Sequence, residues 1–282
     1  MIYNKLPISV LIMTQNEEDN ISHAIESVKD SFTQVVVTDS FSTDSTKQIC
    51  KKYSEVEYYE HKFDGWAEQR NWMLENCNIE NEIVFFLDAD EWIDKDFIEE
   101  LRDIIANDIK FSAIYLKVKY IFLNRWLKYS YGHPLIKRVF KKDGLYFSGE
   151  GAREYAHIDE TNTIELKSYL IHQDRKSFSF WINKHNNNAE REATLYIEKL
   201  KNEMTTQDSN LAFKLKVKLW IRKNIWDKIP LGVRPLFYFL YRYFAQLGFL
   251  DGKEGFIFCV NHALWYQMLI DIKIIEKGLN EK

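Results

Sequence analysis

The sequence predicts an α/β fold, with a mostly parallel sheet flanked by helices and a C-terminal helical extension that is rich in aromatic and basic residues. Over the first 110 or so residues, short apolar runs alternate with segments whose apolar residues recur at helical spacing, as in strand–helix–strand units. The run IVFFL at 83–87 is apolar throughout, which is typical of a strand buried on both faces. Because 46% of the 282 residues are hydrophobic, the chain can bury a large core.

The expected elements follow one another along the chain. Strands are predicted at residues 8–13, 34–38, 56–59 and 83–87, and later at 111–122 and 136–141. The first helix is indicated by Ile21, Ala24, Ile25 and Val28, which are spaced to share one helical face. Further helices are predicted at 44–53 with Ser42 or Thr43 as the cap, at 66–76, around Phe97 and Leu101 after the capping residue Asp94, and at 178–204.

The C-terminal part carries two apolar runs, PLFYFLYRYFAQLGFL and GFIFCVNHALWYQMLI, which are joined by the polar turn DGKE. Each run has about 16 residues, fewer than the roughly 20 that cross a bilayer. Residues 210–243 contain eight basic residues and one acidic residue, Asp227. Segment 211–275 is therefore expected either to lie on a membrane surface or to pack on the α/β part of the chain or on a second subunit in a homo-oligomer.

Composition excludes several other classes. The net charge of -4 and the pI near 6.0 argue against a nucleic-acid-binding protein, since such proteins are usually basic. Cys50, Cys77 and Cys259 form no CxxC pair, so neither a disulfide framework nor a zinc knuckle is indicated. The N-terminal residues do not resemble a signal peptide, and we expect a cytoplasmic protein, working either in solution or at the inner face of the cell membrane.

Polar side chains follow three of the predicted strands. Thr14, Asn16 and Glu17 come after the first strand, and Asp39 comes after the second. The fourth strand ends in the run FLDADEW, which contains Asp88 and Asp90. The carboxyl ends of parallel strands meet at one sheet edge, where ligands bind in open α/β sheets. Two carboxylates of this kind suit Mg²⁺ or Mn²⁺; the alternative is that they cap the next helix.

Six segments together resemble the family 2 glycosyltransferases of GT-A (Rossmann-like) fold, and in particular the bacterial enzymes that build lipopolysaccharide cores, capsules and exopolysaccharides. They are SVLIMTQNEEDNI, VVVTDSFSTDST, WAEQRNWML, FFLDADEW, GEGAREY and LIHQDRKS, over residues 9–180. The resemblance implies an inverting, metal-dependent hexosyltransferase. Its donor would be a nucleotide-diphosphate sugar, expected to be UDP-linked, and its acceptor a hydroxyl of a glycan or lipid-linked glycan. The expected parts are a nucleotide-sugar-binding half at 1–110, an acceptor half at 111–205 and a helical extension at 206–282.

The resemblance also assigns roles to residues. Thr14, Asn16, Glu17 and Asp39 would bind the nucleoside, Arg70, Asn71, Asp88 and Arg175 the rest of the donor, and Asp90 and His172 the metal, Mn²⁺ or Mg²⁺. Lys176 is expected to close over the phosphates together with Arg175. Alternatives stay open: Asp39 could serve only its own turn, Arg70 and Asn71 could be solvated surface residues, and His172 could be an ordinary core histidine.

The catalytic base is expected to be Glu154, in the run AREY, because the family places an acidic residue after the acceptor-side strands. Arg153 stands where the family usually has histidine, so Glu150 is kept as the second candidate. The alternative for Glu154 is a structural ion pair with Arg153 or Lys142.

Two other functions share this core. A sugar nucleotidyltransferase usually has a glycine-rich loop after its first strand, whereas MTQNEEDN contains no glycine. A non-catalytic nucleotide-sugar-binding protein is the third reading.

Overall fold

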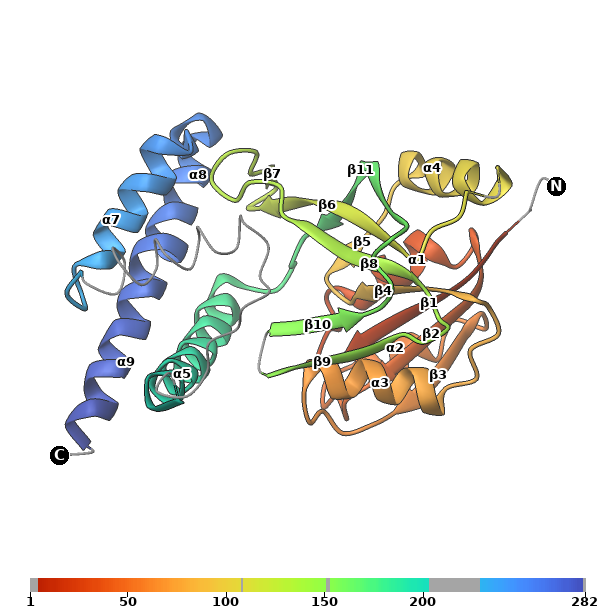
Figure 1. Cartoon of the computed structure of the whole chain (residues 1–282), viewed down its shortest axis with the longest axis horizontal. Helices are drawn as coiled ribbons and strands as arrows, with labels where there is room; N and C mark the ends of the chain where they lie inside the picture. The colour runs from red at the N-terminus through yellow and green to blue at the C-terminus, as the bar shows by residue number, and fades with distance from the viewer. Residues whose placement is uncertain (1–4, 108, 151–152, 203–228, 281–282) are drawn as a thin grey trace. The chain divides into compact units, whose positions relative to one another are not determined.

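The computed structural model describes residues 5–107, 109–150, 153–202 and 229–280. The chain divides into two compact units, here called the α/β unit (Met1–Trp126 and His133–Lys176) and the helical unit (Leu127–Gly132 and Ser177–Lys282) (Figure 1). These units differ from the three expected segments, because residues 111–176 join the α/β unit except for Leu127–Gly132. The long helix after Ser177 belongs with the C-terminal helices.

The α/β unit is built on a mixed sheet, which confirms the predicted fold class. In the described residues the strand order is β3-β2-β1-β4-β8-β6-β11-β5, with β7 paired to β6. Pairing is parallel from β3 to β4 and between β6 and β11, and antiparallel elsewhere. The strands are β1 (Leu6–Thr14), β2 (Phe32–Asp39), β3 (Val56–Glu60), β4 (Ile83–Asp88), β5 (Glu91–Trp92), β6 (Ala113–Phe122), β7 (Arg125–Trp126), β8 (Leu135–Lys141) and β11 (Thr163–His172).

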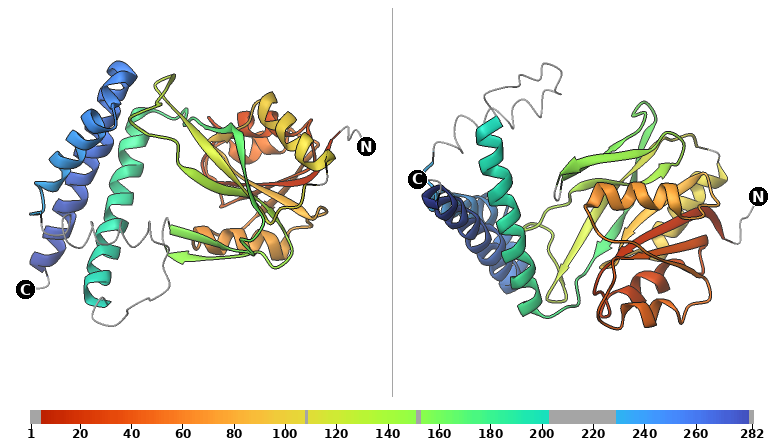
Figure 2. Two further views of the ribbon diagram at one scale, coloured as in Figure 1. Left: turned by 45° about the horizontal axis from the view of Figure 1, so that its top comes forward. Right: turned by 90° about the horizontal axis from the view of Figure 1, so that it is seen from below.

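Helices cover both faces of this sheet (Figure 2), because the side chains of β1 alternate between two apolar clusters. Ile8, Val10 and Ile12 pack with the side of α1 and α4, whereas Leu11 and Met13 pack with α3. The helices are α1 (Ile21–Val28), α2 (Thr46–Cys50), α3 (Trp66–Asn76) and α4 (Lys95–Ala106), and a separate hairpin is formed by β9 (Tyr146–Glu150) and β10 (Arg153–His157).

Most of the predicted elements are confirmed. The helix at 66–76 has the expected bounds, and Asp94 caps α4 by accepting a hydrogen bond from the Phe97 amide at 3.1 Å. The prediction for α2 was wrong in length and cap: the helix begins only at Thr46 and has no side-chain cap. The reason is that the Ser42 hydroxyl is used by Asp39, 2.5 Å away, in the preceding loop.

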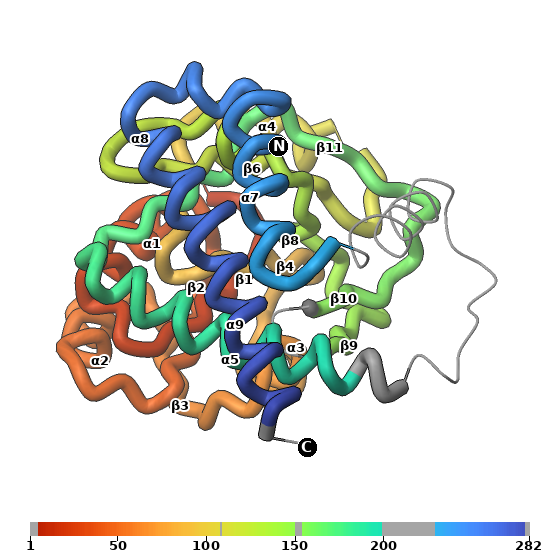
Figure 3. The backbone as a smooth tube through the Cα atoms, turned by 90° about the vertical axis from the view of Figure 1, so that its left-hand side faces the viewer, coloured from red at the N-terminus to blue at the C-terminus, as the bar shows by residue number. Residues whose placement is uncertain are grey.

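The helical unit contains α5 (Phe178–Asn202), α7 (Arg234–Leu240), the π-helical turn η2 (Tyr241–Ala245), the 3₁₀ turn η3 (Gly248–Asp251), α8 (Gly252–Phe258), the π-helical turn η4 (Cys259–Trp265) and α9 (Tyr266–Asn280). The helix α9 packs along α5, and α7 packs against η4 (Figure 3). The most basic part of the C-terminal region, 203–228, lies outside the described residues. Among the helices that are described, none is both long and apolar enough to cross a membrane.

The DGKE segment is not simply a polar turn between two apolar runs, because Asp251 is buried and α8 begins directly after it. The Asp251 carboxylate accepts hydrogen bonds from the amides of Lys128, Tyr129 and Ser130 at 2.7–3.0 Å, and from the Ser130 hydroxyl at 2.6 Å. A single carboxylate therefore holds loop 127–132 in the helical unit.

Two glycines permit this arrangement. A Cβ atom at Gly255 would lie 2.5 Å from the Gly248 carbonyl oxygen, and one at Gly248 would lie 2.8 Å from the Arg242 carbonyl oxygen. Both distances are shorter than van der Waals contact, so neither position accepts a side chain without a backbone shift. The motif GFLDGKEG thus combines two close backbone contacts with the Asp251 carboxylate.

We expect Gly255→Ala to lower the free energy of unfolding by about 1–3 kcal/mol through overpacking. Gly278→Ala is the matched control, because Gly278 also lies in a helix but has open space where its Cβ would be. The control should be neutral or slightly stabilising, since alanine favours a helix more than glycine does. Chemical denaturation of both variants measures the difference, and equal effects would contradict the close contact at Gly255.

Candidate active site

The sheet register confirms that three of the predicted strand ends meet at one edge. Thr14 is paired with Asp39 across β1 and β2, and Met13 is paired with Asp88 across β1 and β4. The short strand β5 then pairs with the end of β11, which places His172 opposite Glu91. The Gln173 amide donates to the Asp90 carbonyl oxygen at 2.9 Å. The DADEW loop and the segment after β11 are therefore held side by side.

Arg70 lies at the centre of the site. It projects from α3, is 1% exposed, and its guanidinium carbon lies 4.7 Å from the centre of the Phe86 ring. Its Nε donates to Glu154 Oε2 at 2.7 Å, and a terminal nitrogen lies 3.5 Å from Asp88 Oδ1. The alternative that Arg70 is a solvated surface residue is therefore wrong. Arg70 joins the candidate base to the first aspartate of the DAD run.

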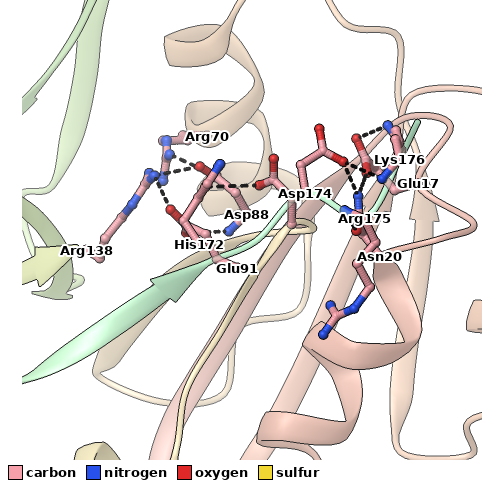
Figure 4. Close-up of polar contacts among 11 residues, drawn as sticks. Glu17, Asn20, Arg70, Asp88, Glu91, Arg138, His172, Asp174, Arg175 and Lys176 are labelled. Carbon is pink, nitrogen blue, oxygen red and sulfur yellow. Dashed lines mark hydrogen bonds and ion pairs between the residues drawn. The ribbon is translucent and has the colours of Figure 1, made fainter. Parts of the chain in front are cut away.

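Arg138, on β8, is a second cation that the sequence analysis did not identify. Its Nη2 donates to Asp88 Oδ2 at 2.5 Å and to Glu91 Oε1 at 3.2 Å (Figure 4). Its Nη1 lies 3.7 Å from Glu154 Oε1. We call Arg70, Asp88, Glu91, Arg138 and Glu154 the charge network. It places two guanidinium groups among three carboxyl groups that come from β4, β5 and β10.

Burial and charge act against each other in this network. Burial alone would raise the pKa of Asp88, but the Arg138 and Arg70 guanidinium groups outweigh it and hold that pKa below its ordinary value. Burial raises the pKa of Glu91 to about 7, although Arg138 opposes the shift. Burial would lower the pKa of Arg138, and its three carboxylate neighbours raise it above the ordinary value. Arg138 is therefore a permanent cation beside the DAD run.

Asp90 and His172 form a pair at the same edge. The Nδ1 atom of His172 lies 3.7 Å from Asp90 Oδ1, and the imidazole ring stacks on Tyr120 with 4.9 Å between ring centres. Carboxylate and imidazole groups both suit Mn²⁺, so these residues fit the metal that the sequence implies. Within the described residues, no three His, Cys, Asp or Glu side chains are grouped to hold a metal. A metal here would take its other ligands from substrate phosphates and water.

Glu17 ties the loop after β1 to the segment after β11. Its Oε1 accepts from Lys176 Nζ at 2.5 Å, and its Oε2 accepts from Asn20 Nδ2 at 2.7 Å. Asn20 also donates to Asp174 at 3.0 Å and accepts from the Arg175 amide at 2.9 Å. Burial, followed by the Asp90 charge, raises the pKa of Glu17. Lys176 is ion-paired with Glu17 in this structure and would have to leave it to contact a phosphate. The Arg175 side chain is exposed.

The nucleoside candidates lie in a tightly bonded loop. The buried Asp39 carboxylate accepts from the Ser42 amide and hydroxyl and from the Tyr58 hydroxyl, at 2.5–3.1 Å. Asn16 has a positive φ of 55° and accepts from the Thr43 amide at 2.8 Å. The Thr14 hydroxyl is buried with no hydrogen-bond partner in the described structure. Asp39 thus serves its own turn, and its nucleoside role stays a prediction.

Asn71 holds the hairpin that carries Glu154. Its amide nitrogen donates to the Phe147 carbonyl oxygen and its amide oxygen accepts from the Phe147 amide, both at 2.8 Å. This pair of hydrogen bonds fastens β9 to α3. Glu154 lies on the neighbouring strand β10, and its side chain is 25% exposed. Glu154 does not pair with Lys142, which donates to the Ile79 carbonyl oxygen instead. The side chains of Arg153 and Glu150 lie outside the described part.

Known proteins resemble parts of this chain. It is 33% identical over 106 residues to the lipopolysaccharide core biosynthesis glycosyltransferase LpsC of Rhizobium meliloti, over 36% of this chain and 38% of that protein. It is 32% identical over 104 residues to the glycosyltransferase GlyA of Streptococcus pneumoniae, over 33% and 14% of the two chains. The chain thus spans less than half the length of either relative.

Among solved structures, TarS 1–349 of S. aureus in complex with UDP aligns with a TM-score of 0.49 and 17% identity, covering 98% of this chain and 92% of that one. The decisive match is to a family rather than to one protein. Residues 9–158, which are 150 of the 282 residues and include Glu17, the charge network and Asp90, match the model of glycosyl transferase family 2. This chain therefore belongs to glycosyl transferase family 2.

Proposed function

We propose that the protein is an inverting glycosyltransferase that moves a hexose from a UDP-linked donor to a hydroxyl of a glycan or lipid-linked glycan. The observation that carries the proposal is the charge network, because Arg70 and Arg138 connect Glu154 directly to Asp88. The candidate base and the DAD run, which is proposed to bind the diphosphate, are thereby held next to each other at the sheet edge. Family membership supports the reaction class, and the relative named for lipopolysaccharide core synthesis supports the acceptor class.

Glu154 is proposed to act as the base. As the acceptor oxygen attacks the anomeric carbon from the face opposite the diphosphate, Glu154 takes the hydroxyl proton. The new carbon–oxygen bond forms while the bond between the sugar and the phosphate oxygen breaks, and the nucleoside diphosphate leaves with the electron pair. Arg70 orients the carboxylate by its 2.7 Å hydrogen bond, and Asn71 holds the hairpin beneath it.

Asp90 and His172 are proposed to hold Mn²⁺ or Mg²⁺, which when bound would stabilise the negative charge that develops on the leaving diphosphate. Asp88 is bound by both arginines, so its part is to position the donor rather than to complete a metal cage. Thr14, Asn16, Glu17 and Asp39 would line the nucleoside pocket. These residues lie at or just after the carboxyl ends of β1 and β2, next to the DAD run.

Arg175 is proposed to contact the diphosphate, because it is exposed and its backbone is fastened to Asn20 beside Glu17. A guanidinium group forms strong paired hydrogen bonds with phosphate oxygens. Lys176 could join it only after leaving Glu17. The alternative function, a sugar nucleotidyltransferase, would join a nucleoside triphosphate to a sugar 1-phosphate, which forms a nucleotide sugar and releases pyrophosphate, and it would not release nucleoside diphosphate.

The test is a panel of nucleotide sugars with Mn²⁺, in which release of nucleoside diphosphate is measured with and without acceptor glycans. Excess EDTA should abolish the release, and Mn²⁺ or Mg²⁺ should restore it. Asp90→Ala should abolish transfer and weaken Mn²⁺ binding measured by calorimetry. Asp30→Ala is the matched control, because the Asp30 side chain is 75% exposed and Asp30 precedes β2, at the end of this strand opposite to Asp39. Full activity in excess chelator would refute the metal. Formation of a nucleotide sugar and free pyrophosphate from a nucleoside triphosphate and a sugar 1-phosphate, with no release of nucleoside diphosphate from the panel, would refute glycosyl transfer.

A further inference from the structure

The helical unit exposes a continuous stripe of large apolar side chains on α7 and η2. Their spacing of three, four and seven residues places them on one side of the helix. Each is between 40% and 56% exposed, although side chains of this type are usually buried. The stripe consists of Val233, Leu236, Phe237, Leu240, Tyr241 and Phe244.

The charged residues of the same segment point the other way. Arg234 is buried and its Nε donates to Asp271 Oδ1 at 2.7 Å. Arg242 is also buried; its Nη2 donates to the Tyr131 carbonyl oxygen at 3.2 Å, and its Nη1 lies 3.1 Å from His262 Nδ1. A helix on a water-exposed surface normally shows the reverse pattern, with apolar residues inside and charges outside. This helix instead buries its cations in hydrogen bonds and presents its apolar side outward.

The pattern continues beyond η2. Leu247, Phe249, Leu250 and Phe256 are 42–48% exposed, and Tyr129, in the loop that Asp251 holds, is 39% exposed. We call these five residues and the stripe together the apolar face. In the described stretch 229–252, the three charged residues, Arg234, Arg242 and Asp251, are all buried.

The exposed charges next to the apolar face are positive. Lys253 has a side chain that is 86% exposed, whereas its neighbour Glu254 is only 13% exposed. Lys128 is exposed as well, and its amide is bound by Asp251, two residues before Lys253. Apolar and aromatic side chains bordered by lysines are suited to the interface of an anionic bilayer, where the rings enter the headgroup region and the ammonium groups meet lipid phosphates.

We propose that the apolar face docks on the surface of an anionic lipid bilayer without crossing it. A second copy of the chain is the competing occupant. A two-fold symmetric contact places the same patch on both partners, so it would bring the lysines of one copy close to those of the other. Residues 214–228 add six basic residues and one acidic residue to the sequence just before this helix. Charge therefore favours anionic lipid over a second copy.

The experiment is co-sedimentation of the full chain with vesicles of phosphatidylcholine that contain 30% phosphatidylglycerol. The double variant Phe237→Ser/Phe244→Ser removes two side chains from the centre of the stripe. We expect it to weaken vesicle affinity about tenfold or more, since each phenylalanine contributes apolar area on insertion. Added salt should weaken binding of the wild type. The matched control is Ile109→Ser/Leu123→Ser, which makes a similar change at exposed apolar side chains of the α/β unit.

The control should bind as the wild type does, and circular dichroism should show that both double variants fold, because all four side chains are exposed. Wild-type protein that stays in the supernatant overturns the proposal. So does a wild-type dimer, measured by light scattering, that the stripe variant dissociates while vesicles bind neither protein. None of these measurements involves sugar transfer, so the outcome is independent of the proposed enzyme activity.

Discussion

Replacing Glu154 by glutamine is expected to lower kcat by about 10²–10⁴-fold, the usual cost of losing a positioned base, and to leave donor affinity nearly unchanged. The amide keeps the size of the side chain, and its carbonyl oxygen can still accept the hydrogen bond from Arg70 Nε. It cannot take up the acceptor proton. A loss confined to kcat is the signature of an interaction used only in the transition state. Initial rates against donor concentration, with calorimetric donor binding, measure both quantities.

Glu165→Gln is the matched control for this variant. Glu165 also forms an ion pair, 2.6 Å from Lys117, but it lies on β11 and is 45% exposed. The Glu165→Gln variant should retain the kcat and the donor affinity of the wild type. If Glu154→Gln turns over at the wild-type rate, Glu154 is not the base, and the same replacement at Glu150 becomes the next test. A fall in donor affinity with unchanged kcat would instead assign Glu154 to donor binding.

Arg70→Ala is expected to lower the free energy of unfolding by about 3–5 kcal/mol, because it removes one partner from a buried ion-pair network. The loss combines two effects. Glu154 and Asp88 would each lose one of the two guanidinium groups that contact them, and the Phe86 and Phe147 rings would lose the guanidinium group that packs on them. Arg70→Met separates the two effects, since methionine restores packing without charge. Denaturation in urea measures the free energy of unfolding of the wild type, Arg70→Ala and Arg70→Met.

Lys62→Ala provides the comparison with a surface pair. Lys62 lies 2.6 Å from Asp64, but both side chains are more than half exposed, and such pairs contribute little to stability. We expect Lys62→Ala to have the same free energy of unfolding as the wild type. An Arg70→Ala variant that is as stable as Lys62→Ala would mean that the network does not support the fold.

Arg70→Lys should also fail to restore the activity that Arg70→Ala loses, because an ammonium group cannot reproduce the planar contacts of guanidinium.

The strand ends of the site could be predicted from the sequence because each follows an apolar run that can only be a buried strand. Once the runs at β1, β2 and β4 are recognised as parallel neighbours, their carboxyl ends must share an edge, and Asp39 and Asp88 must lie there. Asp94 could be predicted as a cap for a similarly local reason, since its hydrogen bond spans three residues.

Arg138 could not be predicted, because the run LIKRVFK gives no local sign that its arginine points inward. That orientation depends on β8 entering the sheet between β4 and β6, which is a pairing over about 50 residues of sequence. The bond between Glu17 and Lys176 spans 159 residues and leaves no periodic signal. The number of carboxylates in the predicted site gives one general indication, because buried carboxylates need buried cations to balance their charge.

The single carboxylate that fastens loop 127–132 also has a consequence for biosynthesis. Strand β8 follows this loop, and its partners β4 and β6 precede it, so these three strands can pair as soon as residue 141 is free of the ribosome, and β11 can join β6 once residue 172 has followed. The loop must wait for Asp251, about 120 residues later, which at 5–20 residues per second is roughly 6–24 seconds. During that interval the amides of Lys128, Tyr129 and Ser130 can bind only water or a passing acceptor. The α/β unit is thus expected to finish folding while one of its own connections is still open, closed at last by a residue from the far end of the chain.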